Sequence, residues 1–374
     1  MRRKLLTFAA ILMFSVGVFG SASAQEPQFK DEFFKGEVID ILGEQQSEVI
    51  GDQQVTQQAQ VRITSGAEKG EIKKIEHRLQ SSAKETQGLV PGEPVVVLKN
   101  QEFDISTYYI MDKYRLPWLA VLMLAFFGLT IFFTGKRGVT ALLGLGFNIF
   151  VIVSFIIPSI MSGSSPLLVC FGGGLVIAVV SLYCAHGFNK RSSIALASTL
   201  ITLVIALILS IIFVKLTKLS GAGTEEAFFL QFGEYARVNL RGLLLGGIII
   251  GALGVLDDVT TAQSAAVEEL KRANPQLSFE ELYKRGLSIG KEHITSLVNT
   301  LALAYAGASL PVLLIFTIID RPFWVILNSE DVVEEMVRTL VGSSALILAV
   351  PIATVLAAHF FSTGKLSTSS AHRH

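Results

Sequence analysis

Acidic, histidine and amide side chains beside long apolar segments are the candidates for chemistry in this sequence. Asp257 and Asp258 directly follow an apolar run, and Glu292 and His293 precede a second run that contains Asn299. Ionisable groups at membrane depth are energetically costly and are usually functional. Carboxylates supply negative charge and histidines titrate near neutral pH, so these residues could line a path for a cation or for protons. The alternative is that they cap helices, pair with neighbouring charges or contact lipid headgroups.

Two further histidines and a second asparagine lie near these positions. His186 and His359 are expected at the same membrane boundary, where each alone is more typical of headgroup contact than of a site. Asn148 and Asn299 lie within apolar segments, where asparagine commonly forms hydrogen bonds between helices. Whether such a cluster holds a metal ion stays open at this point.

Several classes of catalytic or cofactor site are not indicated by the sequence. It contains no HExxH or CxxC motif and no Cys/His cluster. Cys170 and Cys184 share one apolar segment, where a helix would hold them about 21 Å apart, too far for a disulfide. We therefore predict no catalytic residues, no cofactor and no enzymatic activity.

Glycines precede the acidic pair at helical spacing. Gly247, Gly251 and Gly254 share a helix face with Asp258, whereas Asp257 is rotated about 100° away. Small residues at this spacing allow helix backbones to approach closely. This face is predicted to pack against another helix, either within the chain or in a second copy of it.

The elements that carry these residues are predicted to be membrane helices. The chain is 51% hydrophobic and only 17% charged, and its 31 basic and 31 acidic residues cancel. This balance excludes the basic excess of a nucleic-acid-binding protein and makes the lipid bilayer the expected partner. Seven apolar segments are long enough to be spanning candidates: 117–134, 139–160, 166–185, 192–214, 240–256, 294–319 and 339–361.

The N-terminus has the pattern of an export signal. Residues 1–24 combine basic residues, an apolar run and a small-residue end, which predicts a signal peptide, with an uncleaved anchor as the alternative. Residues 25–115 alternate in short stretches, which predicts an exported β-rich domain resembling a small OB or SH3 barrel. Its strands are expected near 37–42, 60–64, 73–76 and 95–98.

The remaining chain, residues 116–374, is predicted to be a seven-helix transmembrane domain. The segments expected inside carry eleven Lys and Arg residues and those outside carry five, which places the C-terminus in the cytoplasm of a bacterial plasma-membrane protein. A cytoplasmic helical loop is predicted at 257–293. Within it, Ser278 and Glu281 form the pattern of a capping box, and Pro311 predicts a kink in the following span.

Two stretches resemble the YibE/F-like family of bacterial multi-pass membrane proteins. They are GIIIGALGVLDDVTTAQ at 247–263 and GLSIGKEHITSLVNTLALAYAGASLP at 286–311. The resemblance extends to the YYIMDKYR stretch at 108–115 and over all seven spans. It implies a multi-pass plasma-membrane protein and assigns no substrate.

The most direct functional interpretation is a transporter, permease or transporter subunit. In this interpretation Asp258, Asp257, Asn299, Glu292 and His293 line the transport or proton path, and Gly247, Gly251 and Gly254 mediate helix packing. The alternative is a membrane scaffold or signalling protein whose exported domain binds a partner. A homo-oligomer or a partner membrane subunit fits either alternative, because glycine faces also mediate association between chains.

Overall fold

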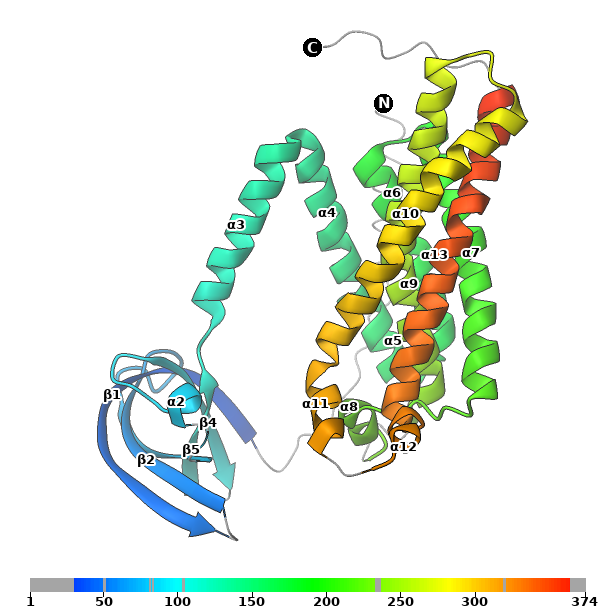
Figure 1. The fold of residues 1–374 in the computed structure, drawn as a ribbon. Coiled ribbons are helices and arrows are strands. Elements are labelled where there is room, and N and C mark those ends of the chain that lie inside the picture. Colours follow the sequence, from blue (N-terminus) through cyan, green and yellow to red (C-terminus); the bar gives the residue numbers. More distant parts are fainter. Residues whose placement is uncertain are drawn as a thin grey trace. The chain divides into compact units, whose positions relative to one another are not determined.

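The computed structural model describes residues 30–49, 52–80, 82, 84–102, 105–232, 237–318 and 321–363. It divides into two compact units, the first ending at Ala125 and the second beginning at Phe126. The predicted signal peptide lies outside the described residues. Figure 1 shows a β-rich N-terminal part followed by helices.

The β-rich unit is one curved antiparallel sheet. Its strands are β1 (Lys30–Val49), β2 (Asp52–Ile63), β3 (Ile72–Gln80), β4 (Pro94–Glu102) and β5 (Ile105–Lys113), in the order β3-β2-β1-β4-β5. Each predicted strand segment falls within a strand of the sheet, except for Thr64, which follows β2. The described strands form a half-barrel, because no hydrogen-bonded ladder joins the edge strands β3 and β5.

Alternating side chains form the core of this sheet. Val55, Ala59, Val61 and Ile63 of β2 are all fully buried, as period-two patterning requires. Register shifts in β1, at Val38/Asp40 and Ile41/Gly43, bend the strand. The sheet therefore curls around one apolar cluster.

A charged cluster joins the strands of this unit to the turn before β3. The Glu68 carboxylate accepts hydrogen bonds from Lys99 Nζ at 2.5 Å and from the Tyr108 hydroxyl at 2.8 Å. Lys73 Nζ lies 3.6 Å from the same carboxylate and 4.6 Å from the centre of the Tyr108 ring. The hydrogen bond from Lys99 lowers the pKa of Glu68 below its ordinary value of 4.5.

Replacing Glu68 with Gln is expected to loosen the sheet at neutral pH. Because folding lowers the pKa of Glu68, its charged form stabilises the fold above about pH 4.5, and this contribution is lost as the pH falls through the folded-state pKa. Amide hydrogen exchange in the full-length protein should be roughly tenfold faster in β2 and β4 of Glu68→Gln near pH 7, and the difference should shrink as the pH falls through the folded-state pKa of Glu68. Glu76→Gln, at an exposed pair with Arg78, is the control. Equal exchange in the Glu68 variant and wild type near pH 7 would contradict the stabilising role.

The second part of the chain is helical. Its longer helices are α3 (Leu116–Thr134), α4 (Lys136–Val151), α6 (Pro166–His186), α7 (Lys190–Leu216), α9 (Leu240–Ala273), α10 (Phe279–Ala308) and α13 (Glu330–Thr363). Shorter elements are α2 (Lys84–Gln87, in the β-rich unit), the π-helical turn η2 (Ile152–Ile156), α5 (Ile157–Met161), α8 (Glu225–Phe229), α11 (Leu310–Ile318) and α12 (Phe323–Leu327).

Six of the described helices are long and apolar enough to cross a membrane. They are 116–134, 136–161, 166–186, 190–216, 240–273 and 330–363. The predicted span at 294–319 is not among them and is divided between α10 and α11, so the seven-span count is not confirmed. The break falls at Ser309, two residues before Pro311, because proline lacks a backbone donor and disfavours helical geometry at the preceding residue.

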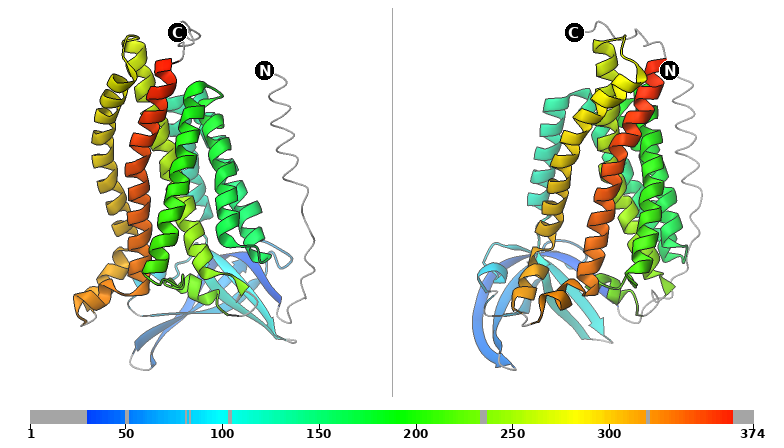
Figure 2. Two further views of the ribbon diagram at one scale, coloured as in Figure 1. Left: turned by 90° about the vertical axis from the view of Figure 1, so that its right-hand side faces the viewer. Right: turned by 45° about the vertical axis from the view of Figure 1, so that its right-hand side comes forward.

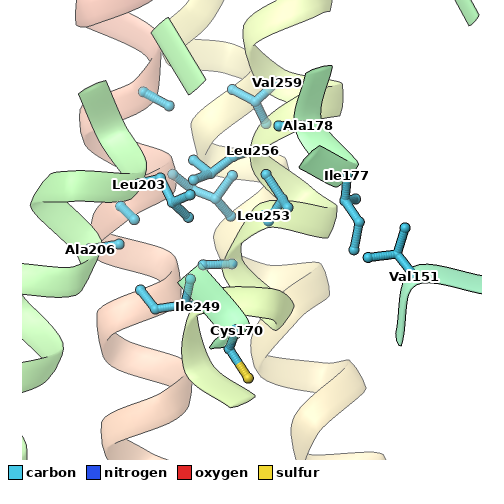
Figure 3. Close-up of a cluster of buried hydrophobic side chains, with 14 of the residues drawn as sticks. Val151, Cys170, Ile177, Ala178, Leu203, Ala206, Ile249, Leu253, Leu256 and Val259 are labelled. Atoms are coloured by element: carbon cyan, nitrogen blue, oxygen red, sulfur yellow. The ribbon is translucent and has the colours of Figure 1, made fainter. Parts of the chain in front are cut away.

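Helix α9 lies at the centre of the helical unit. It packs against α6, α7, α10 and α13, and the views in Figure 2 show α7, α9 and α13 running alongside one another. Figure 3 shows Leu253 and Leu256 of α9 pointing into an apolar cluster with Leu203 of α7 and Ile177 of α6. These contacts fix the rotation of α9 about its own axis.

The local signals around α9 and α10 are confirmed in part. The predicted fifth span and the first part of the helical loop predicted at 257–293 form a single helix of 34 residues. The capping box is present, with Glu281 N donating to Ser278 Oγ and Ser278 N donating to Glu281 Oε2. The helix start that Ser278 and Glu281 predict is therefore confirmed as the start of α10.

Within one chain, glycines other than the three predicted for helix packing lie at close helix contacts. Gly247, Gly251 and Gly254 are exposed, and no described atom lies within 4 Å of a Cβ placed there. Gly246 instead faces α6, where a Cβ would lie 2.6 Å from Cys170 Sγ. Within one chain, α9 therefore approaches α6 closely through the helix face that carries Gly246.

Candidate functional site

A cavity of about 470 Å³ lies among α4, η2, α6 and α9. Its volume is in the range of small-molecule binding sites. Apolar and small side chains form most of its wall, and the polar residues that line it are Asn148, Ser181, His186, Asp257, Asp258 and Thr261. The cavity thus presents polar groups to an otherwise apolar helical interior.

Helix α9 supplies one wall through residues one turn apart. Ile250, Gly254, Asp257 and Thr261 follow one another at steps of four, three and four, and Asp258 is adjacent. Residues at this spacing share a helix face. Because Gly254 has no side chain, the cavity remains open directly beside the acidic pair.

The two carboxylates have different surroundings. Asp257 is half-buried and its Oδ1 atom is enclosed, whereas Asp258 is exposed. The Thr199 hydroxyl on α7 interacts with the Asp257 side chain and also lies 2.8 Å from the Thr260 hydroxyl. Both threonines are fully buried, so the Asp257 side chain has a polar partner inside the helical unit.

Three enclosed oxygen atoms of the lining residues have no hydrogen-bond partner. They are Asn148 Oδ1, Asp257 Oδ1 and Thr261 Oγ1. A buried polar atom without a partner loses its interaction with water and gains nothing in return. Each of the three residues therefore brings an unsatisfied buried polar atom to the surroundings of the cavity, which is uncommon in folded proteins.

The helix that carries Asn148 is irregular just after this residue. The turn Ile152–Ile156 is π-helical, and its first residue lines the cavity. Pro158 follows and has no N–H to donate to the preceding turn. Wide turns of this kind are frequent at functional sites.

The structure separates the residues that the sequence grouped together. Asp257 and Asp258 line the cavity, as does His186, which was expected at the same membrane boundary. Glu292, His293 and Asn299 are exposed on α10 and are not among the cavity residues. His359 lies apart, with its ring centre 6.4 Å from that of Phe279.

Three contributors were not assigned to a site from the sequence. Asn148 was expected to bridge two helices, yet its Oδ1 has no partner among the described residues. In the sequence, Thr261 differs from its neighbours only by its helical spacing from Asp257 and Asp258. Ser181 is an ordinary hydroxyl residue within an apolar segment, so neither residue indicated a site. Among the described residues, no group of three or more His, Cys, Asp or Glu side chains is arranged to hold a metal ion.

The fold and the cavity together define a class of protein. It has several helices of membrane-spanning length and hydropathy, with polar groups gathered in a cavity among them. The chain belongs to the YibE/F-like protein family, whose family model matches residues 122–363. The match covers the cavity but not the β-rich strands. Searches of curated proteins and of solved structures found no match.

Proposed function

We propose that this chain is an integral protein of the bacterial plasma membrane and that it transports a solute, or serves as a transporter subunit, with cation or proton coupling at the cavity. In this proposal the β-rich unit lies outside and the C-terminus lies in the cytoplasm. The observation that carries it is the cavity itself, whose lining combines Asn148, Ser181, His186, Asp257, Asp258 and Thr261 among apolar helices. Polar groups of this kind among apolar helices are characteristic of ion and substrate pathways.

The surroundings of Asp257 argue against simple headgroup contact. A carboxylate that only meets headgroups would have both oxygens open, whereas Asp257 Oδ1 is enclosed and the buried Thr199 hydroxyl interacts with the side chain. Asp257 also lines a cavity large enough for a small solute. The favoured role is therefore reversible binding of a cation, a proton or a solute during transport.

The first test compares proteoliposomes containing the purified chain with protein-free liposomes. An internal pH dye reports proton movement under an imposed membrane potential, in the presence of a panel of cations and solutes. Proton flux that depends on the protein supports transport. Absence of flux across the whole panel would contradict it and would favour the scaffold alternative, which predicts sensitivity on the β-rich surface instead.

Filling the cavity is expected to block transport without disturbing the fold. Gly254 lines the cavity and a Cβ there would contact no described atom, so Gly254→Leu should place its side chain in the open space and reduce flux about tenfold or more. Gly251→Leu is the matched control, because Gly251 is equally exposed on the same helix but does not line the cavity. Equal flux in the two variants would contradict a path through this cavity.

A further inference from the structure

One face of α10 is left exposed by the described part of the chain. Its residues recur at alternating steps of three and four, and all are exposed: Glu292, Thr295, Asn299, Ala302 and Ala306. Ile294, Leu297 and Leu301 lie on the opposite side of the helix and pack against the apolar cluster of the helical unit. We call the five exposed residues the α10 seam. Steps of three and four are the pattern along which two helices pack side by side.

The α10 seam lies at the depth of an apolar stretch of α13. The two helices run antiparallel, because a Cβ on Gly286 would meet Thr354 and a Cβ on Gly290 would meet Val350. Each residue adds the same rise to both helices, so the first three seam residues are level with about residues 341–348 of α13. That stretch belongs to a helix long and apolar enough to cross a membrane. In the membrane protein proposed above, these seam residues are therefore expected within the hydrocarbon region.

A helix face that meets lipid looks different in this protein. On α7, Thr202 and Ser210 are fully buried, whereas Ile201, Val204 and Ile208 are exposed. That helix thus turns hydroxyl groups inward and apolar side chains outward, as contact with hydrocarbon requires. The α10 seam has the reverse distribution, with polar side chains outward. Because polar groups facing hydrocarbon are costly, the seam indicates contact with protein instead of lipid.

We propose that the α10 seam packs against the α10 seam of a second copy of this chain. The inference rests on the membrane location in the proposed function but not on transport. Copies of a membrane protein share one orientation, because the same charges flank the same helices. A two-fold axis perpendicular to the membrane then brings two α10 helices together in parallel, with identical seam residues facing one another.

The seam residues suit contact with their own counterparts. The Asn299 side chain has donors and acceptors and forms no hydrogen bond with another described residue, so two Asn299 amides can hydrogen-bond each other. Ala302 and Ala306 are small and allow two backbones to approach closely. Lys291 is exposed beside Glu292 and offers a cation to Glu292 of the other copy. A single asparagine in such a seam also fixes the register of the paired helices.

Cysteine crosslinking in membranes that contain the full-length chain tests this contact. Cys170 and Cys184 are first replaced by alanine, so that disulfides form only at introduced positions. Under mild oxidation, Asn299→Cys and Ala302→Cys should form a disulfide-linked dimer at least about tenfold more efficiently than Ile201→Cys, which is exposed on α7. Absence of crosslinks in the two seam variants, or equal crosslinking in all three, would overturn the proposal.

The strength of the dimer can be measured with the native cysteines in place. Asn299→Leu removes the amide pair and should weaken dimerisation in liposomes about threefold or more, and Ala306→Phe should hold the backbones apart and weaken it about tenfold or more. Ile208→Phe, exposed on α7, is the matched control and should dimerise like wild type. Energy transfer between labelled copies, followed as lipid is added, gives the dimer fraction. Wild-type dimerisation of both seam variants would overturn the α10 contact.

Other outcomes separate this contact from its alternatives. If Asn299→Cys forms no crosslink and is labelled by a water-soluble maleimide, the seam lines a water-filled path and the contact is overturned. Release of the chain from membranes by alkaline carbonate would remove the membrane location, on which this inference and the proposed function both rest. Crosslinked dimers without flux in liposomes would retain the α10 contact and remove only the transport proposal.

Discussion

Asp257→Asn is expected to abolish cation- or proton-driven flux in proteoliposomes while leaving the protein folded. Asparagine has almost the same shape as aspartate but can neither lose a proton nor balance a positive ion. Asp257 is the cavity carboxylate with an enclosed oxygen and an interaction with the buried Thr199 hydroxyl, so its charge faces the least water. We expect flux to fall by about a hundredfold or more, to the level of protein-free liposomes.

Two other variants on α9 serve as comparisons for Asp257→Asn. Asp258→Asn should reduce flux less, because Asp258 lines the same cavity but is exposed. Glu269→Gln, an exposed position on the same helix that pairs with Arg272, should leave flux unchanged. Gel filtration and thermal unfolding would verify that each variant is folded. Wild-type flux in folded Asp257→Asn would exclude this carboxylate from the transport path.

Gly290→Val is expected to cause the largest loss of stability in the helical unit. Gly290 is buried where α10 meets α9 and α13, and a Cβ there would lie 2.3 Å from Val350 Cγ1 and 2.9 Å from Gln263 Oε1. The Gln263 side chain is itself held in place, because its Nε2 donates hydrogen bonds to Gly286 O and Thr354 Oγ1, each at 2.8 Å. Overpacking of this kind lowers the free energy of unfolding by about 1 to 3 kcal/mol or more. The midpoint temperature of thermal unfolding should therefore fall by roughly 5 °C or more.

A second glycine on α10 provides the matched control. Gly307 has no described atom within 4 Å of a Cβ position, so Gly307→Ala should leave the unfolding midpoint unchanged or raise it slightly through better helix propensity. Midpoints can be compared by heating detergent-solubilised protein and measuring the soluble fraction by gel filtration. Equal midpoints for the Gly290 and Gly307 variants would contradict the close packing of α10 against α13.

The sequence alone determined the features that depend on neighbours along the chain. Strand positions follow from period-two alternation, the long helices from hydropathy, and the start of α10 from Ser278 and Glu281. The choice of Asp257 and Asp258 as candidates also followed from local context, because an acidic pair at the end of an apolar segment is energetically costly. The family resemblance was confirmed over residues 122–363.

Only the tertiary structure decided which of these residues meet. It places Asn148 and Asp257 in the lining of one cavity, although 108 residues lie between them in the sequence, and it leaves Glu292 exposed on α10. It also divides the predicted sixth span at Ser309 and leaves the half-barrel without a hydrogen-bonded closure. The helical period reveals which residues share a face but not which helix that face will meet. In an apolar unit many helix faces are nearly equivalent, so side-chain packing selects the partner.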